Sequence, residues 1–324
     1  MKSSFSKKLG LISVVFFVLN GLPHEVKAWG FFMHKKINSH AIYLLPPELM
    51  TLYKNNEFII KVHSTKPDNR RYVDPKEGPR HFIDLDTYMA IDTGFIGLNY
   101  MAAKELHGRC VDKSHDFGQD GILPWHCLLM MHLLTEAMKG GHIEDILRIS
   151  GELGHYLSDA HVPLHTTQNY NGQRSGQHGI HGLWESIIPE LEFEQYDYWI
   201  DEGLTVWDNP LDRLWSIIVD SHNLLFSVFS AEYCVSEDVN IPKYSYRYRQ
   251  GRAKRTYSIA FCKQYAELCE GHIEERYKAA VHAVACAWFT CWVNAGKPQF
   301  QNQVIPINPS YQDELNHPSS CDHH

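Results

Sequence analysis

The strongest constraint on the fold is the helical spacing of apolar residues in HIEDILRISGELGHYLSDAHV, residues 142–162. Five of them fall on one face of a helix: Ile143, Ile146, Leu147, Ile149 and Leu153. Residues 34–49, 125–141, 210–233 and 255–296 are also helical in pattern, and the last stretch is long enough for one or two helices. We find no sustained strand-like alternation, no internal repeat and no glycine-rich phosphate loop. The pattern predicts an all-α fold, a single compact multi-helix domain.

Two polar, irregular segments interrupt this helical pattern, at residues 64–86 and 165–186. The first is rich in aspartate and proline, and the second in glycine, histidine and asparagine. Long loops in compact domains are usually functional or disordered. We therefore expect the functional residues to lie in and around these two segments.

The N-terminus has the form of a secretory leader. A basic start, MKSSFSKK, precedes a 14-residue apolar run from Leu9 to Leu22, and Val26-Lys27-Ala28 suits a signal peptidase. The run is short for a membrane span, which needs roughly 20 apolar residues. We predict a signal peptide at 1–28, cleavage between Ala28 and Trp29, and a secreted or periplasmic protein. An uncleaved interfacial anchor is the alternative.

Charge and cysteine content refine this prediction. The leader holds four lysines and one glutamate, so its removal takes the formal net charge from −8 to −11. An acidic chain is a poor nonspecific binder of polyanions. Some of the eight cysteines could pair in an exported protein, but Cys286 and Cys291 lie in an apolar helical run and are interpreted as buried thiols. We expect the domain to cover 29–296, followed by a loosely packed tail at 297–324.

The spacing of histidines and carboxylates indicates a metal site. His155 and Asp159 are four residues apart, and so are His181 and Glu185, so each pair lies on one helix face. His165 lies between the pairs, just after Pro163. Imidazole and carboxylate groups paired in this way are suitable zinc ligands.

These residues resemble the zinc-dependent phospholipase C family and its relatives, the single-strand-specific zinc nucleases. Members are all-helical and hold three zinc ions on an N-terminal Trp, followed by His, Asp and Glu ligands in a fixed order. The matching positions in this chain are, in order, Trp29, His34, Asp68, His81, His155, Asp159, His165, His181 and Glu185. The match spans the mature chain up to about Glu185, with only compatible helices beyond it.

The resemblance implies how the three ions share these ligands. One zinc takes Asp68, His81, His155 and Asp159. A second takes His34, the other oxygen of Asp159, and the amine and carbonyl oxygen of Trp29, which must then be the first residue of the mature chain. The third takes His165, His181 and Glu185.

The resemblance also implies the reaction, which is hydrolysis of a phosphodiester by attack of metal-bound hydroxide on phosphorus. The predicted catalytic residues are Asp68, which orients the water, and Arg71, which contacts the phosphoryl oxygens. Asp74 competes with Asp68 for its place, and the family's Arg three residues later favours Asp68. His161 and His178 do not fit the ligand spacing, and we interpret them as supporting or surface histidines.

Two substrate classes are compatible with the motifs. Glu185 as the last ligand and the segment HFIDLD, residues 81–86, are similar to the phospholipases, whereas the short WGFFMH step is closer to the nucleases. We expect a phospholipid head group as substrate, with transient membrane-surface contact, and a nucleic acid only if the chain is a nuclease. A non-catalytic zinc protein is a further alternative. Predicted substrate-binding residues are Phe82, Asn169 and Asn171, although turn formation accounts for both asparagines equally well.

Overall fold

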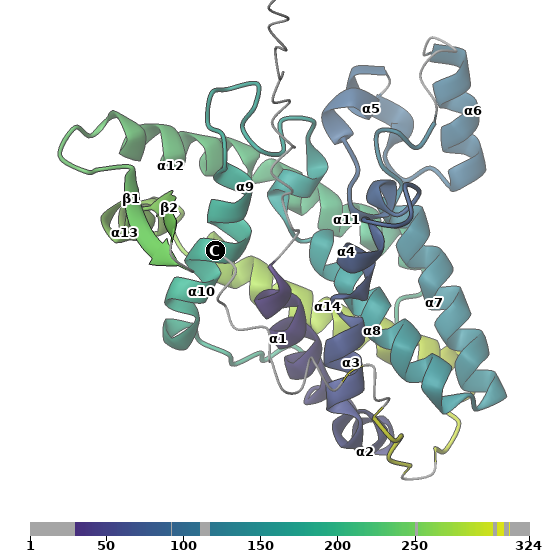
Figure 1. The fold of residues 1–324 in the computed structure, drawn as a ribbon. Helices are drawn as coiled ribbons and strands as arrows, with labels where there is room; N and C mark the ends of the chain where they lie inside the picture. The colour runs from purple at the N-terminus through teal and green to yellow at the C-terminus, as the bar shows by residue number, and fades with distance from the viewer. Residues whose placement is uncertain are drawn as a thin grey trace, which may run out of the picture.

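The computed structural model describes residues 30–91, 93–110, 117–249, 252–300, 303–307 and 311. The predicted signal peptide and Trp29 lie outside these residues. Figure 1 shows a bundle of helices with one small hairpin at its edge. The predicted all-α fold is confirmed, and the hairpin is an addition to it.

The described residues form sixteen helices and strands, in chain order: α1 (Phe31–Ile42), α2 (Pro47–Asn55), α3 (Glu57–His63), α4 (Lys66–Arg70), α5 (Leu85–Ile91), α6 (Tyr100–Cys110), α7 (Leu123–Gly140), α8 (Ile143–Asp159), α9 (Ile180–Gly182), α10 (Ile188–Glu192), α11 (Pro210–Asn223), α12 (Leu225–Glu237), β1 (Tyr244–Arg249), β2 (Arg252–Tyr257), α13 (Ile259–Leu268) and α14 (His272–Asn294). Single helical turns are η1 (Gly78–His81), η2 (Thr93–Phe95), η3 (Pro163–Thr166), the π-helical η4 (Leu183–Ile187) and η5 (Phe193–Gln195).

Helix α8 is the centre of the bundle and packs against α1, α3, α7 and α14. Its first turn carries Glu144 and Asp145, which favourably face the positive end of the helix dipole. Its second half is buried on all sides. Ser150 joins it to two neighbours, because its carbonyl accepts from the Trp288 indole at 3.1 Å and its hydroxyl lies 2.7 Å from the Tyr53 hydroxyl.

Two glycines allow other elements to approach α8 closely. A Cβ on Gly151 would lie 2.7 Å from the carbonyl oxygen of Ile60 in α3. A Cβ on Gly154 would lie 2.0 Å from the amide oxygen of Asn38 in α1. Both distances are below normal van der Waals contact, so only glycine fits this packing. The close approach brings α1, α3 and α8 together at the end of α8 that carries His155 and Asp159.

The end of α8 is determined by Pro163. The residue before a proline disfavours the helical region, and Val162 is extended, with φ −91° and ψ 117°. The chain therefore leaves the helix after Asp159 and re-enters a single turn, η3, which carries His165. The sharp turn returns His165 to the same end of the bundle.

The β1–β2 hairpin was not predicted. The segment YSYRYR alternates tyrosine with serine or arginine, which is the two-residue period of a strand, but this alternation lasts for only six residues. Its partner RAKRTY alternates weakly, so neither strand stands out in the sequence. The strands pair antiparallel, with Tyr246 opposite Arg255 and Arg247 opposite Lys254.

The stretch 210–233, which we expected to be a single helix, contains two helices. Helix α11 ends at Asn223 and α12 begins at Leu225. By length and composition, Pro210–Glu237 could cross a membrane. In the fold, however, Leu214, Trp215 and Ile218 of α11 are buried in the core, so this pair of helices is part of the bundle.

The cysteines and the C-terminal tail complete the fold. Six of the cysteines, Cys127, Cys234, Cys262, Cys269, Cys286 and Cys291, are free thiols, and the predicted burial of Cys286 and Cys291 is observed. Within the described part of the tail, the Gln303 carbonyl accepts from the Asn56 side chain, whose oxygen accepts from Ile305. These two bonds attach the tail to the region between α2 and α3.

Candidate metal centre

Eight of the nine predicted ligands lie within the described residues, and the structure brings all eight together. They form three groups whose ligand atoms lie within 4.8 Å of one another: His34, His155 and Asp159; Asp68, His81 and His155; and His165, His181 and Glu185. Each of these residues is at most 5% exposed. They come from α1, α4, η1, α8, η3, α9 and η4, so the site exists only in the folded chain.

Asp159 connects the first two groups. Its Oδ1 lies 3.5 Å from His34 Nε2, and its Oδ2 lies 2.9 Å from His81 Nδ1 and 3.3 Å from His155 Nε2. The two oxygens of one carboxylate therefore face different groups. This is the arrangement expected of a carboxylate that bridges two metal ions.

The third group is built on a local irregularity. His181 lies in α9, and Glu185 lies in the π-helical turn η4. His181 Nε2 is 3.0 Å from Glu185 Oε2, and His165 Nε2 is 3.6 Å from the same oxygen. Short π-helical turns are rare and often occur at functional sites.

Three of the histidines hold one ring nitrogen ready for a ligand. His155 Nδ1 donates to the Ser64 carbonyl at 2.8 Å, and His165 Nδ1 donates to the His81 carbonyl at 2.5 Å. His81 directs Nε2 toward Glu77 at 3.5 Å. Carbonyl and carboxylate oxygens accept hydrogen bonds. The ring nitrogen that faces such an oxygen therefore carries the proton, and the other ring nitrogen, which faces the site, keeps its lone pair. Metal-binding histidines are oriented in this way.

The charge balance of the site also fits a cation. Burial lowers the pKa of His81 and His165 to about 4 and that of His181 to about 3, so these imidazoles are neutral. Burial, with Asp68 and Glu185 nearby, raises the pKa of Asp159 well above its ordinary value. Buried carboxylates beside neutral rings need a compensating positive charge. Divalent zinc, which binds imidazole and carboxylate together, fits this donor set.

Glu77 is a supporting residue that the sequence analysis missed. It is fully buried and accepts hydrogen bonds from Arg70 at 3.2 Å, from Arg80 at 2.6 Å and from the Tyr156 hydroxyl. Burial alone would raise its pKa, but the hydrogen bonds with His81, Tyr156 and Arg70 lower it well below the ordinary value. An ionised Glu77 fixes the ring of His81. The sequence signal was its i, i+4 spacing to His81, within a segment that we interpreted as irregular.

The two predicted catalytic residues lie together at this site. Asp68 is 3% exposed, whereas the side chain of Arg71 is 38% exposed, with Nη1 3.7 Å from Asp68 Oδ1. Arg71 is thus a cation that solvent can reach beside the buried groups. Asp74, the competing aspartate, accepts from the backbone of Lys76 at 2.9 Å in a turn and belongs to none of the three groups.

The predicted substrate-binding residues have different surroundings. Phe82 follows His81 and is partly exposed. Asn169 accepts from the backbone N–H of Arg174 at 2.7 Å, and Asn171 accepts from that of Gly179 at 3.0 Å. Both asparagines therefore stabilise the loop that leads to His181. Contact of these three residues with substrate stays a prediction.

The histidines outside the ligand spacing have other roles. His161 is buried, and its Nδ1 donates to the Leu157 carbonyl at 2.7 Å. His178 is exposed, and its carbonyl accepts from the Tyr257 hydroxyl at 3.2 Å. Neither belongs to the three groups.

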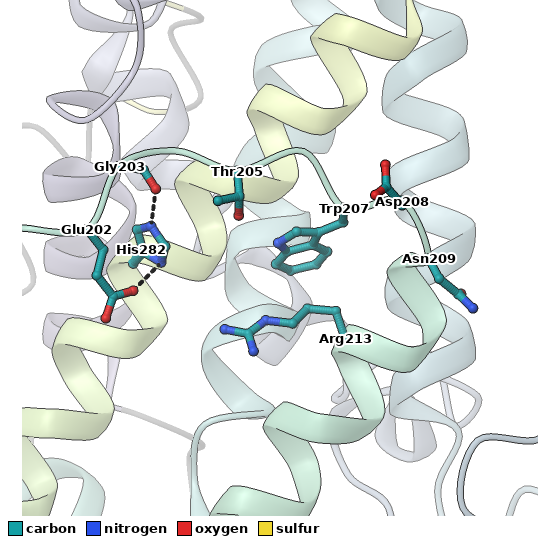
Figure 2. Close-up of a pocket in the computed structure, with 8 residues that line it drawn as sticks. All are labelled: Glu202, Gly203, Thr205, Trp207, Asp208, Asn209, Arg213 and His282. Carbon is teal, nitrogen blue, oxygen red and sulfur yellow. Dashed lines mark hydrogen bonds and ion pairs between the residues drawn. The ribbon is translucent and has the colours of Figure 1, made fainter.

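A separate hollow of about 580 Å³ lies over α14 and shares no residue with the metal groups. Figure 2 shows His282 there, bonded to Glu202 and to the carbonyl of Gly203. Beneath them, the sulfur of Cys286 lies 3.4 Å from His282 Nε2 and accepts from the Thr205 N–H at 3.4 Å. Burial alone would raise the pKa of Cys286, but the hydrogen bonds from His282 and Thr205 lower it.

Comparison with known proteins places the fold. A scan against protein-family models and a search of curated proteins gave no match. A search of solved structures found "Alpha Toxin from Clostridium Absonum", with a TM-score of 0.50 and 14% sequence identity. The alignment covers 85% of this chain, which spans 65% of the length of the toxin chain. At this identity the similarity establishes that the two chains share a mostly helical fold.

Proposed function

We propose that this chain is a zinc-dependent phosphodiesterase of the phospholipase C type, exported and active after removal of residues 1–28. The observation that carries the proposal is the set of three buried groups, two of which share His155 and are further joined by Asp159, whose Oδ2 lies 2.9 Å from His81 Nδ1. The fold similarity to the alpha toxin is consistent with it. The proposed ligands are the eight residues of these groups and the N-terminal amine and carbonyl of Trp29.

Bound zinc would supply Lewis acidity and positive charge for hydrolysis of a phosphate ester. The protein's own residues would do the rest. The buried carboxylates Asp68, Asp159 and Glu185 offset at most three positive charges, so a site with three divalent ions stays attractive to a phosphodiester. Asp68 would accept a hydrogen bond from the attacking water and orient it. Arg71 would bind the phosphoryl oxygens, whose negative charge grows in the transition state.

A phospholipid head group is the substrate that we propose. Glu185 at the last ligand position and the segment HFIDLD support it. The single-strand-specific nuclease is the second candidate, because Phe82 is partly exposed directly beside His81, where a base could stack on it.

The test is activity of the chain beginning at Trp29, loaded with zinc, on phosphatidylcholine vesicles and on single-stranded DNA side by side. We expect release of phosphocholine with little DNA cleavage, and loss of that activity after chelation. DNA cleavage without lipid hydrolysis would favour the nuclease. Stoichiometric zinc with no turnover of either substrate would indicate a non-catalytic zinc protein and contradict the proposal.

A further inference from the structure

The β1–β2 hairpin concentrates positive charge on an acidic protein. Residues 243–257 contain six lysines and arginines and no acidic residue. The whole chain has a formal net charge of −8, so the rest of it carries −14. Charge segregated in this way creates a local field that attracts anions.

The arrangement of these cations has no structural benefit for the hairpin itself. Arg247 lies opposite Lys254, so two like charges face each other across the strands. Like charges directly opposite destabilise a strand pair. Among the described residues, Lys243 at the base forms an ion pair with Glu232, whereas Arg247 and Lys254 are both exposed and have no such acidic partner. An external anion would relieve this repulsion.

Exposed aromatic side chains lie on the face of the hairpin opposite to Arg247 and Lys254. Tyr246 is 74% exposed and Tyr248 is 80% exposed. Both lie on the same face as Tyr244, whose ring is covered by Arg255 at 4.3 Å. Tyrosine combined with lysine and arginine suits the head-group region of a membrane, where rings and charges both find partners.

The base of the hairpin rests on the loop that precedes the third metal group. Tyr257, at the end of β2, is buried, and its hydroxyl donates to the carbonyl of His178, three residues before His181. Gln177 in the same loop donates to Glu232, the ion-pair partner of Lys243. Figure 1 shows the hairpin at one edge of the bundle, beside α10 and α13. A membrane bound to the hairpin would therefore be attached to the loop that leads to His181.

We propose that the β1–β2 hairpin is a docking surface for membranes that contain anionic phospholipid. This inference rests on the proposed function, because it specifies that the substrate of the metal site is a phospholipid within a membrane. A planar membrane can meet a projecting hairpin alone. A nucleic acid strand would have to extend past it along the rest of the mature chain, whose net charge is −17 once the six hairpin cations are taken from the −11 of the mature chain, and so fits less well.

The test is sedimentation of the zinc-loaded protein with vesicles of phosphatidylcholine alone and of phosphatidylcholine mixed with phosphatidylglycerol. We expect the mixed vesicles to bind more tightly, and added salt to weaken that binding. Arg247→Gln with Lys254→Gln should weaken it about tenfold or more, since each cation near an anionic surface contributes substantially. Tyr246→Ser with Tyr248→Ser should reduce binding to both kinds of vesicle.

The matched control is Lys104→Gln with Lys139→Gln, which removes the same charge from exposed positions on α6 and α7. We expect it to bind as the wild type does. Zinc content and melting temperature identify any variant that misfolds. If the Arg247→Gln, Lys254→Gln variant misfolds, Arg255→Gln is used in its place as the hairpin charge variant. Equal vesicle binding by the hairpin and control variants would overturn the proposal. Hairpin-dependent binding of single-stranded DNA without vesicle binding would overturn it in favour of nucleic acid.

Hydrolysis of a soluble phosphodiester, p-nitrophenyl phosphorylcholine, separates this proposal from the proposed function. If the wild type hydrolyses the ester but its vesicle binding does not depend on the hairpin, only the docking surface is wrong. If it binds anionic vesicles through the hairpin but hydrolyses no phosphodiester, only the enzymatic function is wrong.

Discussion

At the scale of single residues, the candidate site depends on one carboxylate, that of Asp159, whose two oxygens have different partners. Asp159 faces His34 with one oxygen and His81 and His155 with the other. The i, i+4 spacings of His155 to Asp159 and of His181 to Glu185 could be predicted from the sequence, because one helix turn brings each pair together. The approach of His34 to Asp159 could not, because it depends on packing between α1 and α8. Only the family resemblance suggested it.

Asp159→Asn should therefore empty more of the site than Glu185→Gln. An amide is a poorer zinc ligand than a carboxylate. The two oxygens of Asp159 face His34 and His81, which belong to different groups, whereas Glu185 faces only its own group. Zinc analysis of purified protein should show a loss of about two ions for Asp159→Asn and about one for Glu185→Gln. Asp74→Asn is the matched control and should keep all of them. Equal losses from the Asp159 and Glu185 variants would refute a bridging role.

The adjacent arginines Arg70 and Arg71 are expected to have different roles, Arg70 in stability and Arg71 in catalysis. Arg71→Ala should lower the rate on the order of 100-fold with zinc retained, because Arg71 is proposed to stabilise transition-state charge. Arg70 instead bonds to Glu77, Glu152 and the Tyr156 hydroxyl. Arg70→Ala should thus reduce the free energy of unfolding by about 1–3 kcal/mol. Rate and urea denaturation measured on both variants check this, and an unchanged rate in Arg71→Ala would remove that residue from the mechanism.

At the scale of elements, the long helices follow from apolar periodicity, but their boundaries and the hairpin do not. The break between α11 and α12 falls at Leu224, without a proline or glycine to mark it. The hairpin strands are six residues each, too short to stand out against helical neighbours. By contrast, Gly141, which is left-handed at φ 69°, caps the end of α7, and Pro163 lies four residues beyond the end of α8, as glycine and proline commonly do at helix ends.

Gly151→Ala tests the close packing of α3 on α8. The added Cβ would clash with the carbonyl oxygen of Ile60. Because this oxygen belongs to the backbone of α3 and cannot rotate away as a side chain could, α3 must shift. The shift would also displace the Ser64 carbonyl that orients His155. We expect a loss of about 1–3 kcal/mol in the free energy of unfolding, together with weaker zinc binding. Gly108→Ala, in α6 with open space around it, should be neutral or slightly stabilising. Equal stability of the two variants would contradict this close packing.

Cys286, in α14 beneath the segment 202–209, is predicted to have a thiol whose pKa is lower than that of an ordinary cysteine. Hydrogen bonds from His282 and Thr205 lower its pKa despite burial, whereas burial raises the pKa of Cys262 to about 11 and of Cys291 to about 12. Thiolate absorbance near 240 nm, taken as wild type minus Cys286→Ser, should therefore appear at lower pH than for an ordinary thiol. His282→Asn should move it to higher pH, and Cys262→Ser should leave it unchanged. A Cys286 signal that ionises only with the other buried thiols would rule out this environment.

At the scale of the whole molecule, the helical bundle gathers seven separate elements around one set of buried ligands. The mostly helical fold is shared with a solved toxin structure, and three buried groups of histidines and carboxylates in it could hold metal ions. The β1–β2 hairpin is basic, whereas the rest of the chain has a negative formal net charge. The central claim that unites these features is that the folded chain holds three metal ions.

The most direct test of that claim is the zinc content of the mature chain beginning at Trp29, measured by atomic absorption after removal of loosely bound metal. The three buried groups predict close to three zinc ions per chain. A content near one, under conditions in which the protein is folded, would contradict the claim.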